Sequence, residues 1–286
     1  MTTGTPWVPS RARPREVRSA AGATPARRTA ARALAALVML ATTAAVYGLT
    51  VASAFALSAD GLSVHGAAYT DEATVLRSLG LDSGARPNLF ALDSARLAAA
   101  LRAQPAIDTT RSDAVSVRVV LPNRLVVEVH ERQPILAWQV GQQRFLADSQ
   151  GVLMAAAEAT AAPVLPTIVD VRVLAGRLHV GGQLDAVDLA VARLIGAISP
   201  ALLGSAAEAL EISVSDDEGY VLQPVGGTWR AVFGIYTPHG RGADLVAAQV
   251  ECLTSLLHGR EASVAVAYLF PEGGQCGTYT RPAATP

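Results

Sequence analysis

Residues 115–134 read VSVRVVLPNRLVVEVHERQP, and this stretch decides the fold of the region around it. Valine and leucine alternate with polar side chains on both sides of Leu121-Pro122-Asn123. That alternation predicts two strands joined by a turn. Alternation of this kind is typical of an antiparallel pair with one dry face and one wet face.

The residues upstream predict two helices and one more strand. Asp93 is placed to cap a helix that Pro105 stops, and Thr70 is placed to cap an earlier helix that runs to Gly80. A short apolar stretch over residues 57–65 precedes both helices. The sequence therefore predicts a first domain over residues 58–133 with the order β-α-α-β-β.

The composition excludes several classes of protein. Of 286 residues, 51% are hydrophobic and 16% are charged, which excludes a disordered or fibrous chain. All 23 basic residues are arginine, and 24 acidic residues bring the net charge to −1, so no overall positive field favours nucleic acid. Residues 1–32 nevertheless hold seven of the arginines against one acid, Glu16. This stretch is predicted to be a disordered basic tail.

An uncharged segment follows that tail. As a helix, residues 33–57 reach about 38 Å, enough to cross a hydrocarbon core of about 30 Å. The positive-inside rule then places Arg27, Arg28 and Arg32 in the cytoplasm and the rest of the chain outside. A cleaved signal peptide is the alternative, because the small residues at 52–56 resemble a cleavage site, but the long leader favours a retained anchor in the bilayer.

A second domain is expected over residues 134–270, followed by a flexible tail at 271–286. Asp148–Gly151 predicts a hairpin turn, and the remaining elements are less sharply marked. Two helices are expected, at residues 185–198 and 244–257. Strands are expected at residues 210–214, 220–223, 229–233 and 264–270.

The chain lacks the usual residue patterns of catalysis. Its five histidines are scattered without metal-ligand spacing, and a lysine-containing phosphate loop is impossible in a chain without lysine. We therefore expect no enzyme activity, metal, cofactor or small-molecule substrate. Cys252 and Cys276 could form a disulfide in an oxidising exterior, but Cys252 also suits a buried helix face as a small apolar residue.

Several short motifs resemble the FtsQ/DivIB family of bacterial cell-division proteins. They are Gly80-Leu81, Asn88-Leu89-Phe90, Leu92-Asp93, Pro105-Ala106-Ile107, Leu121-Pro122-Asn123-Arg124-Leu125 and Glu131-Arg132-Gln133-Pro134. The resemblance implies an α+β fold: a single N-terminal transmembrane helix, a POTRA domain of order β-α-α-β-β, and a second mixed α/β domain built on an antiparallel sheet. It also implies a division scaffold at the septum in the cell membrane, coupled to septal wall synthesis.

The resemblance further implies binding of FtsB- and FtsL-type coiled-coil proteins, and of other division proteins through the POTRA domain. In the family, the partner adds a strand to an exposed edge at the far end of the β domain. By position, that edge is residues 264–270 here, and the side chains expected to bind are Val264, Val266, Tyr268 and Phe270, with Trp229 adjacent. The alternatives are that these residues close the core, that the chain is a POTRA-containing export module, or that it is an exported enzyme.

Overall fold

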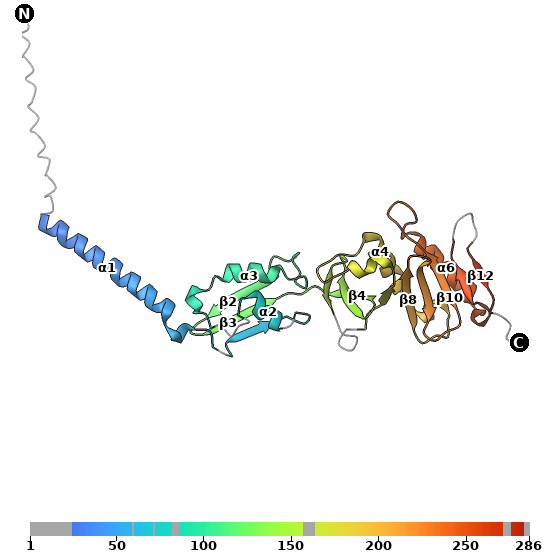
Figure 1. Ribbon diagram of the computed structural model, residues 1–286, viewed down its shortest axis with the longest axis horizontal. Helices are drawn as coiled ribbons and strands as arrows, with labels where there is room; N and C mark the ends of the chain where they lie inside the picture. Colours follow the sequence, from blue (N-terminus) through green and yellow to red (C-terminus); the bar gives the residue numbers. More distant parts are fainter. Residues whose placement is uncertain are drawn as a thin grey trace, which may run out of the picture. The chain divides into compact units, whose positions relative to one another are not determined.

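The computed structural model describes residues 25–58, 60–70, 72–81, 86–156, 164–270 and 276–282. It contains two compact units, Met1–Ser53 and Ala54–Pro286 (Figure 1). Residues 1–24 of the expected basic tail lie outside the described residues.

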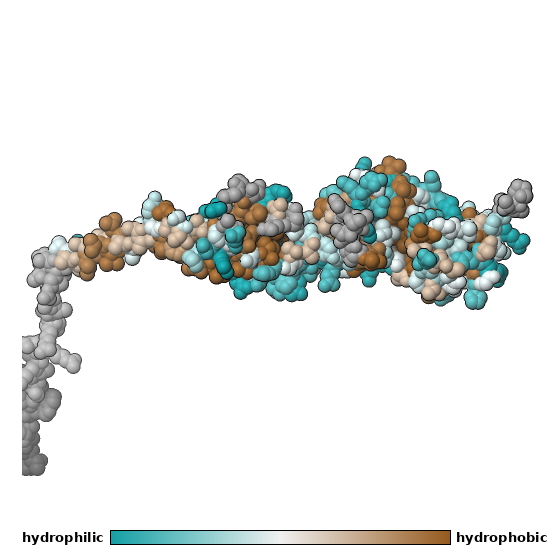
Figure 2. Space-filling view, turned by 90° about the horizontal axis from the view of Figure 1, so that it is seen from below, coloured by the Kyte–Doolittle hydropathy of each residue, from teal (hydrophilic) through white to brown (hydrophobic). Residues whose placement is uncertain are grey.

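The first unit contains helix α1 (Pro25–Val51). Its stretch Thr29–Val51 has 23 residues and a mean hydropathy of 1.9, so it is long and apolar enough to cross a membrane. Hydrophobic surface covers much of the helix (Figure 2). The hydroxyl groups of Thr42, Thr43 and Thr50 donate hydrogen bonds to carbonyls three or four residues earlier. These bonds satisfy the polar side chains within the helix itself.

Helix α1 ends six residues earlier than the predicted span, which was placed over residues 33–57. The residues after the one-turn helix η1 (Ser53–Phe55) belong instead to the second unit, where Leu57 is buried in the core and Ala56 forms a bridge with Asn88. Phe55 also packs edge-on against Phe90 at 4.8 Å. Packing against the following domain therefore takes the apolar residues 55–57 out of the helix.

The first domain of the second unit has the predicted order β-α-α-β-β. Its elements are β1 (Leu62–His65), α2 (Glu72–Ser78), the one-turn helix η2 (Leu89–Ala91), α3 (Ser94–Arg102), β2 (Val115–Val120) and β3 (Arg124–Val129). The sheet order is β1-β3-β2, with β1 parallel to β3 and β2 antiparallel to it. Asp93 caps α3, as predicted, by accepting hydrogen bonds from two backbone N–H groups.

The predicted cap at Thr70 is wrong. Its hydroxyl is buried without a hydrogen bond among the described residues. The carboxylate of Glu131 instead accepts from the backbone N–H groups of Ala68, Tyr69 and Thr70 at 2.7–2.8 Å. A side chain more than 60 residues away in the sequence thus fixes the segment that leads into α2.

The second domain is a nine-stranded sheet of order β12-β11-β10-β9-β8-β7-β4-β5-β6. The strands before the first helix are β4 (Pro134–Val140), β5 (Gln143–Asp148), β6 (Leu153–Ala156) and β7 (Thr167–Asp170). Those after it are β8 (Leu210–Ser215), β9 (Gly219–Pro224), β10 (Arg230–Gly234), β11 (Val266–Tyr268) and β12 (Thr278–Thr280). The expected antiparallel sheet is in fact mixed, because β4–β7, β7–β8 and β10–β11 pair in parallel.

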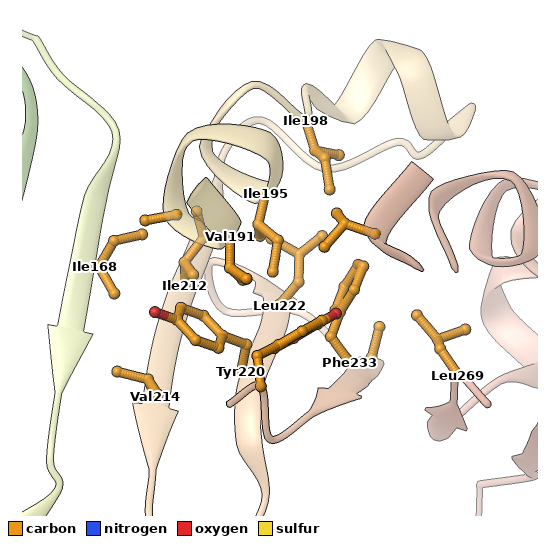
Figure 3. Packing of buried hydrophobic residues seen from close by; sticks show 14 of the residues in the cluster. Ile168, Val191, Ile195, Ile198, Ile212, Val214, Tyr220, Leu222, Phe233 and Leu269 are labelled. Atoms are coloured by element: carbon orange, nitrogen blue, oxygen red, sulfur yellow. The ribbon is translucent and has the colours of Figure 1, made fainter. Parts of the chain in front are cut away.

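Helical segments connect the parallel strands. They are η3 (Val173–Arg177), α4 (Ala186–Gly196), α5 (Pro200–Leu203), α6 (Leu245–Leu257) and η4 (Glu261–Ser263). Val191 and Ile195 of α4 pack on Ile212, Leu222 and Phe233 of the sheet (Figure 3). Parallel pairing requires a crossover long enough to contain a helix, which is why each parallel step from β7 to β8 and from β10 to β11 spans one.

A buried polar network lies within this core. The indole N–H of Trp138 donates to Asp170 at 3.0 Å, and Arg172 pairs with Asp170 and Asp188 at 2.8 Å each. The hydroxyl of Tyr220 donates to Asp188 at 2.7 Å. Burial is the main cause that raises the pKa of Tyr220, so this phenol stays protonated as a donor. The network is satisfied throughout, which removes most of the cost of burying charge.

The two domains meet at a small apolar cluster and an ion pair. Ala106 of the first domain clusters with Ala137, Leu146 and Met154 of the second. Arg132 pairs with Asp148 at 2.6 Å, and the two side chains are 11% and 6% exposed. A pair buried this far is screened little by solvent, so it restrains the junction.

The expected flexible tail over residues 271–286 needs a correction. Residues 278–280 form strand β12, and Cys276 is bonded to Cys252. Residues 271–275 and 283–286 lie outside the described residues. The tail was mispredicted because its order depends on pairing with β11 and on a crosslink to a distant helix.

Candidate partner-binding edge

The large sheet ends at β12. This strand pairs antiparallel with β11, and among the described residues no strand pairs with its other side. The carbonyl of Thr280 accepts a hydrogen bond from the N–H of Ala265 at 2.8 Å, so Thr280 directs its backbone toward β11. Backbone groups alternate in direction along a strand, which turns those of Tyr279 outward. An incoming strand could satisfy these outward groups.

The prediction that residues 264–270 form the sheet edge is wrong. Strand β11 is covered on both sides, by β10 in parallel and by β12 in antiparallel pairing. Val264 is 1% exposed and belongs to the core, so it cannot meet a partner in this structure. Trp229 is likewise buried, with 3% of its surface exposed. Val266 and Tyr268 are half-buried, and Phe270 is exposed.

Three of the predicted residues remain beside the true edge. The register places Val266 opposite Thr280 and Tyr268 opposite Thr278, while the intervening Ala267 is buried in the core. Side chains on one strand alternate between faces, so the four paired residues share the face away from that core. This edge face therefore combines the half-buried Val266 and Tyr268 of β11 with the exposed threonines Thr278 and Thr280 of β12.

Aromatic packing extends the edge face beyond β11. The rings of Tyr268 and Phe270 are stacked with centroids 6.3 Å apart. The guanidinium carbon of Arg241 lies 5.3 Å from the centre of the Phe270 ring, a cation–π distance. The result is an exposed aromatic surface with a positive charge at one end of the edge face.

A buried amide holds the segment that follows β11. Gln249 of α6 is 0% exposed, and its side-chain nitrogen donates to the carbonyls of Phe233 and Leu269 at 2.8 Å each. Its carbonyl oxygen accepts from the hydroxyl of Tyr236. Burial raises the pKa of Tyr236 to about 12, so this hydroxyl remains a donor at neutral pH. Gln249 thus ties α6 to β10 and to the residue before Phe270.

A disulfide holds the edge strand to α6. The sulfur atoms of Cys252 and Cys276 are bonded, and their Cα atoms lie 5.3 Å apart. Cys252 is also only 3% exposed. It is therefore both a disulfide partner and a small buried apolar residue, the two roles that the sequence left open. Because Cys276 comes two residues before β12, the crosslink fixes the start of the edge strand.

Trp229 has a structural partner next to this region. Its indole N–H donates to Glu261 at 2.6 Å, and Glu261 also accepts from Ser205 and from the N–H of Ala206. Burial, the largest single influence, raises the pKa of Glu261, but the three hydrogen bonds together lower it below its usual value. The carboxylate is thus held ionised, and its hydrogen bonds connect η4 to Trp229, the residue before β10.

The structure also bears on the other predicted residues. Arg32 lies exposed on α1, whereas the side chains of Arg27 and Arg28 fall outside the described residues. No group of three histidine, cysteine or acidic side chains in the described part of the chain is arranged to hold a metal. A groove at the domain junction contains several charges, but Arg132 in it pairs with Asp148, and Glu131 binds backbone N–H groups.

Sequence reasoning missed the residues that form the edge. Thr278-Tyr279-Thr280 combines β-branched and aromatic residues, which favour strands. That signal follows a glycine-rich stretch and is only three residues long. The nearby Cys276 was the usable clue, since a disulfide to Cys252 would order the chain around it.

Comparison with known proteins agrees with this architecture. Residues 58–132 match the POTRA domain, FtsQ-type, family. The cell division protein FtsQ of Rickettsia typhi (strain ATCC VR-144 / Wilmington) is 30% identical over 106 residues. The match covers 37% of this chain and 36% of that relative.

Proposed function

We propose that this chain is a member of the FtsQ/DivIB family of cell-division proteins and a single-pass membrane scaffold of the division machinery, because residues 58–132 match the FtsQ-type POTRA domain and an FtsQ protein is 30% identical over 106 residues. In this proposal α1 spans the cell membrane with its N-terminus in the cytoplasm, and both later domains lie outside, at the septum. The arginine-rich start of the chain and a disulfide in the second domain support that orientation. The scaffold is not catalytic and couples assembly at the septum to wall synthesis.

The observation that carries the proposal is the open edge of β12. It offers outward backbone groups at Tyr279, hydroxyl side chains at Thr278 and Thr280, and aromatic surface at Tyr268 and Phe270. We propose that an FtsB-type coiled-coil protein, in complex with an FtsL-type protein, adds a strand here. Main-chain hydrogen bonds would supply affinity, and the alternating side chains of the edge face would supply selectivity.

The partner strand is proposed to lie over β12 and not over β11, as the sequence alone suggested. A substitution inside β11 would disturb two strand pairings at once, so it cannot separate binding from folding. β12 is paired on one side only among the described residues. It is therefore the strand at which binding can be tested with little loss of core structure.

The decisive variant is Tyr279→Pro, which removes the outward N–H and leaves the disulfide in place. We expect the full-length chain carrying it to lose capture of the coiled-coil partners in a detergent pull-down. Tyr279→Phe keeps the backbone donor and most of the packing, so it should bind like the parent chain.

Near-ultraviolet circular dichroism and an intact disulfide would show that the Tyr279→Pro chain is folded. Undiminished partner capture by a folded Tyr279→Pro chain would refute strand addition at β12. Equal loss of capture in Tyr279→Phe would also refute it, because the side chain and not the backbone would then be recognised.

A further inference from the structure

Three segments of the first domain converge at residues 56–58, a few residues after the end of α1 in the sequence. Residues 56–58 run between two turns: the N–H of Leu57 donates to the carbonyl of Pro87 at 3.0 Å, and the N–H of Ser58 donates to the carbonyl of Asn123 at 3.1 Å. Ala56 also bridges Asn88. The turn at residues 86–91 and the turn between β2 and β3 therefore lie on either side of this segment. We call these three segments the juxtamembrane tip.

The juxtamembrane tip exposes large apolar side chains. Leu121 is 53% exposed, while Val120 and Phe90 are each 44% exposed. The ring of Phe90 packs edge-on against Phe55, so its position is fixed although it is exposed. Singly scattered exposed hydrophobic residues need no explanation, but these three lie at the two turns that flank one short segment, which gathers them at one end of the domain.

Arginine is the charged residue type at the two turns. Arg86 opens the first turn and Arg124 closes the second, and both are exposed. Apolar side chains flanked by arginine match the interface of a membrane, where the apolar groups reach the acyl boundary and the cations meet phosphate headgroups.

Chain length restricts what can cover the tip. Val51 ends α1, and Phe55 follows four residues later. Even a fully extended chain spans no more than about 3.6 Å per residue, so Phe55 lies within roughly 14 Å of the end of the span. A membrane that holds the span is therefore within reach of the tip.

We propose that the juxtamembrane tip is a lipid-binding site, with Phe90, Val120 and Leu121 seated at the acyl boundary of the outer leaflet and Arg86 and Arg124 on phosphate headgroups. The site would add a second attachment beside the span and restrict the angle of the exported domains. The inference rests on the part of the proposed function that places α1 in the bilayer, and not on strand addition at β12.

The test uses the full-length chain in vesicles of phosphatidylcholine and phosphatidylglycerol with brominated acyl chains, which quench tryptophan at the bilayer. Phe90→Trp and Leu121→Trp report on the tip. Val173→Trp is the matched control, since Val173 is 86% exposed in the second domain, and Tyr47→Trp reports on the span itself. The emission of the parent chain, with its own three tryptophans, is subtracted.

We expect the tryptophans at 90 and 121 to shift to the blue and lose most of their emission, while that at 173 does neither. Quenching at 47 alone would overturn the lipid site but keep the span. Absence of quenching at 47 would show that α1 does not lie in the bilayer, and it would overturn the proposal together with the membrane topology on which it rests. Quenching at 173 as well would also overturn the proposal, because the contact with lipid would not be specific to the tip. A blue shift at the tip without quenching would overturn it too, because it would show that protein, such as a second copy of the chain, covers the tip.

Discussion

Removing the disulfide should release the edge strand while the core stays folded. The perturbation is the double substitution Cys252→Ala and Cys276→Ala, in which alanine keeps the buried position of Cys252 apolar. The two cysteines are 24 residues apart. The chain-entropy relation for a loop of that length gives about 3.5 kcal/mol of stabilisation.

The structure indicates which segment opens when this stabilisation is lost. β12 has three residues, of which Thr278 and Thr280 are exposed and Tyr279 is half-buried. Beyond its pairing with β11, β12 contributes the half-buried Tyr279 to the core, whereas Cys252 is buried within that core. Local openings are cheapest where buried apolar contacts are few. We therefore expect residues 276–282 to open, with about 300-fold faster hydrogen exchange for the 3.5 kcal/mol.

The assay is hydrogen–deuterium exchange followed by mass spectrometry on the full-length chain, oxidised and in the double variant. Strand β3, buried in the first domain, provides the unchanged reference. If the partner strand binds to β12, partner capture should fall together with the hydrogen-exchange protection of β12. Unchanged exchange in residues 276–282, or faster exchange throughout the second domain, would refute the reasoning.

Three other outcomes are expected. Gln249→Leu should lower the free energy of unfolding by about 2–4 kcal/mol, as measured with denaturant, because it removes the side-chain donor to the Leu269 carbonyl and the acceptor of the Tyr236 hydroxyl, whereas the Phe233 carbonyl keeps its bond from Arg241. The lowered pKa of Glu261 means that its ionised form stabilises the fold at neutral pH, and that this contribution is lost as the pH falls below the ordinary pKa of a glutamate and through the lowered one. Glu261→Gln should therefore weaken the loss of stability in acid, and an unchanged acid dependence would contradict the structural role of this carboxylate. A reporter active only outside the membrane should work when fused after Leu57 and stay silent when fused before Arg32, and the reverse pattern would contradict the orientation.

Local signals made the first domain predictable. The alternation over residues 115–134 requires strands whatever surrounds it, and Asp93 caps its helix with its own side chain. The α+β class, the order of elements and the family resemblance all follow from such signals. The ends of elements were less predictable, as the early end of α1 at Val51 shows.

The candidate site was predictable in place but not in detail. The sequence indicated the far end of the second domain, and Tyr268 and Phe270 do lie there. It could not show that β12 completes the pairing of β11, nor that β10 and β11 run in parallel. The sequence by itself determined the strands, helices and apolar span, because periodicity and capping act over a few residues. Only the tertiary structure decided which strand is left at the edge, because that depends on which distant segment supplies the last backbone partner.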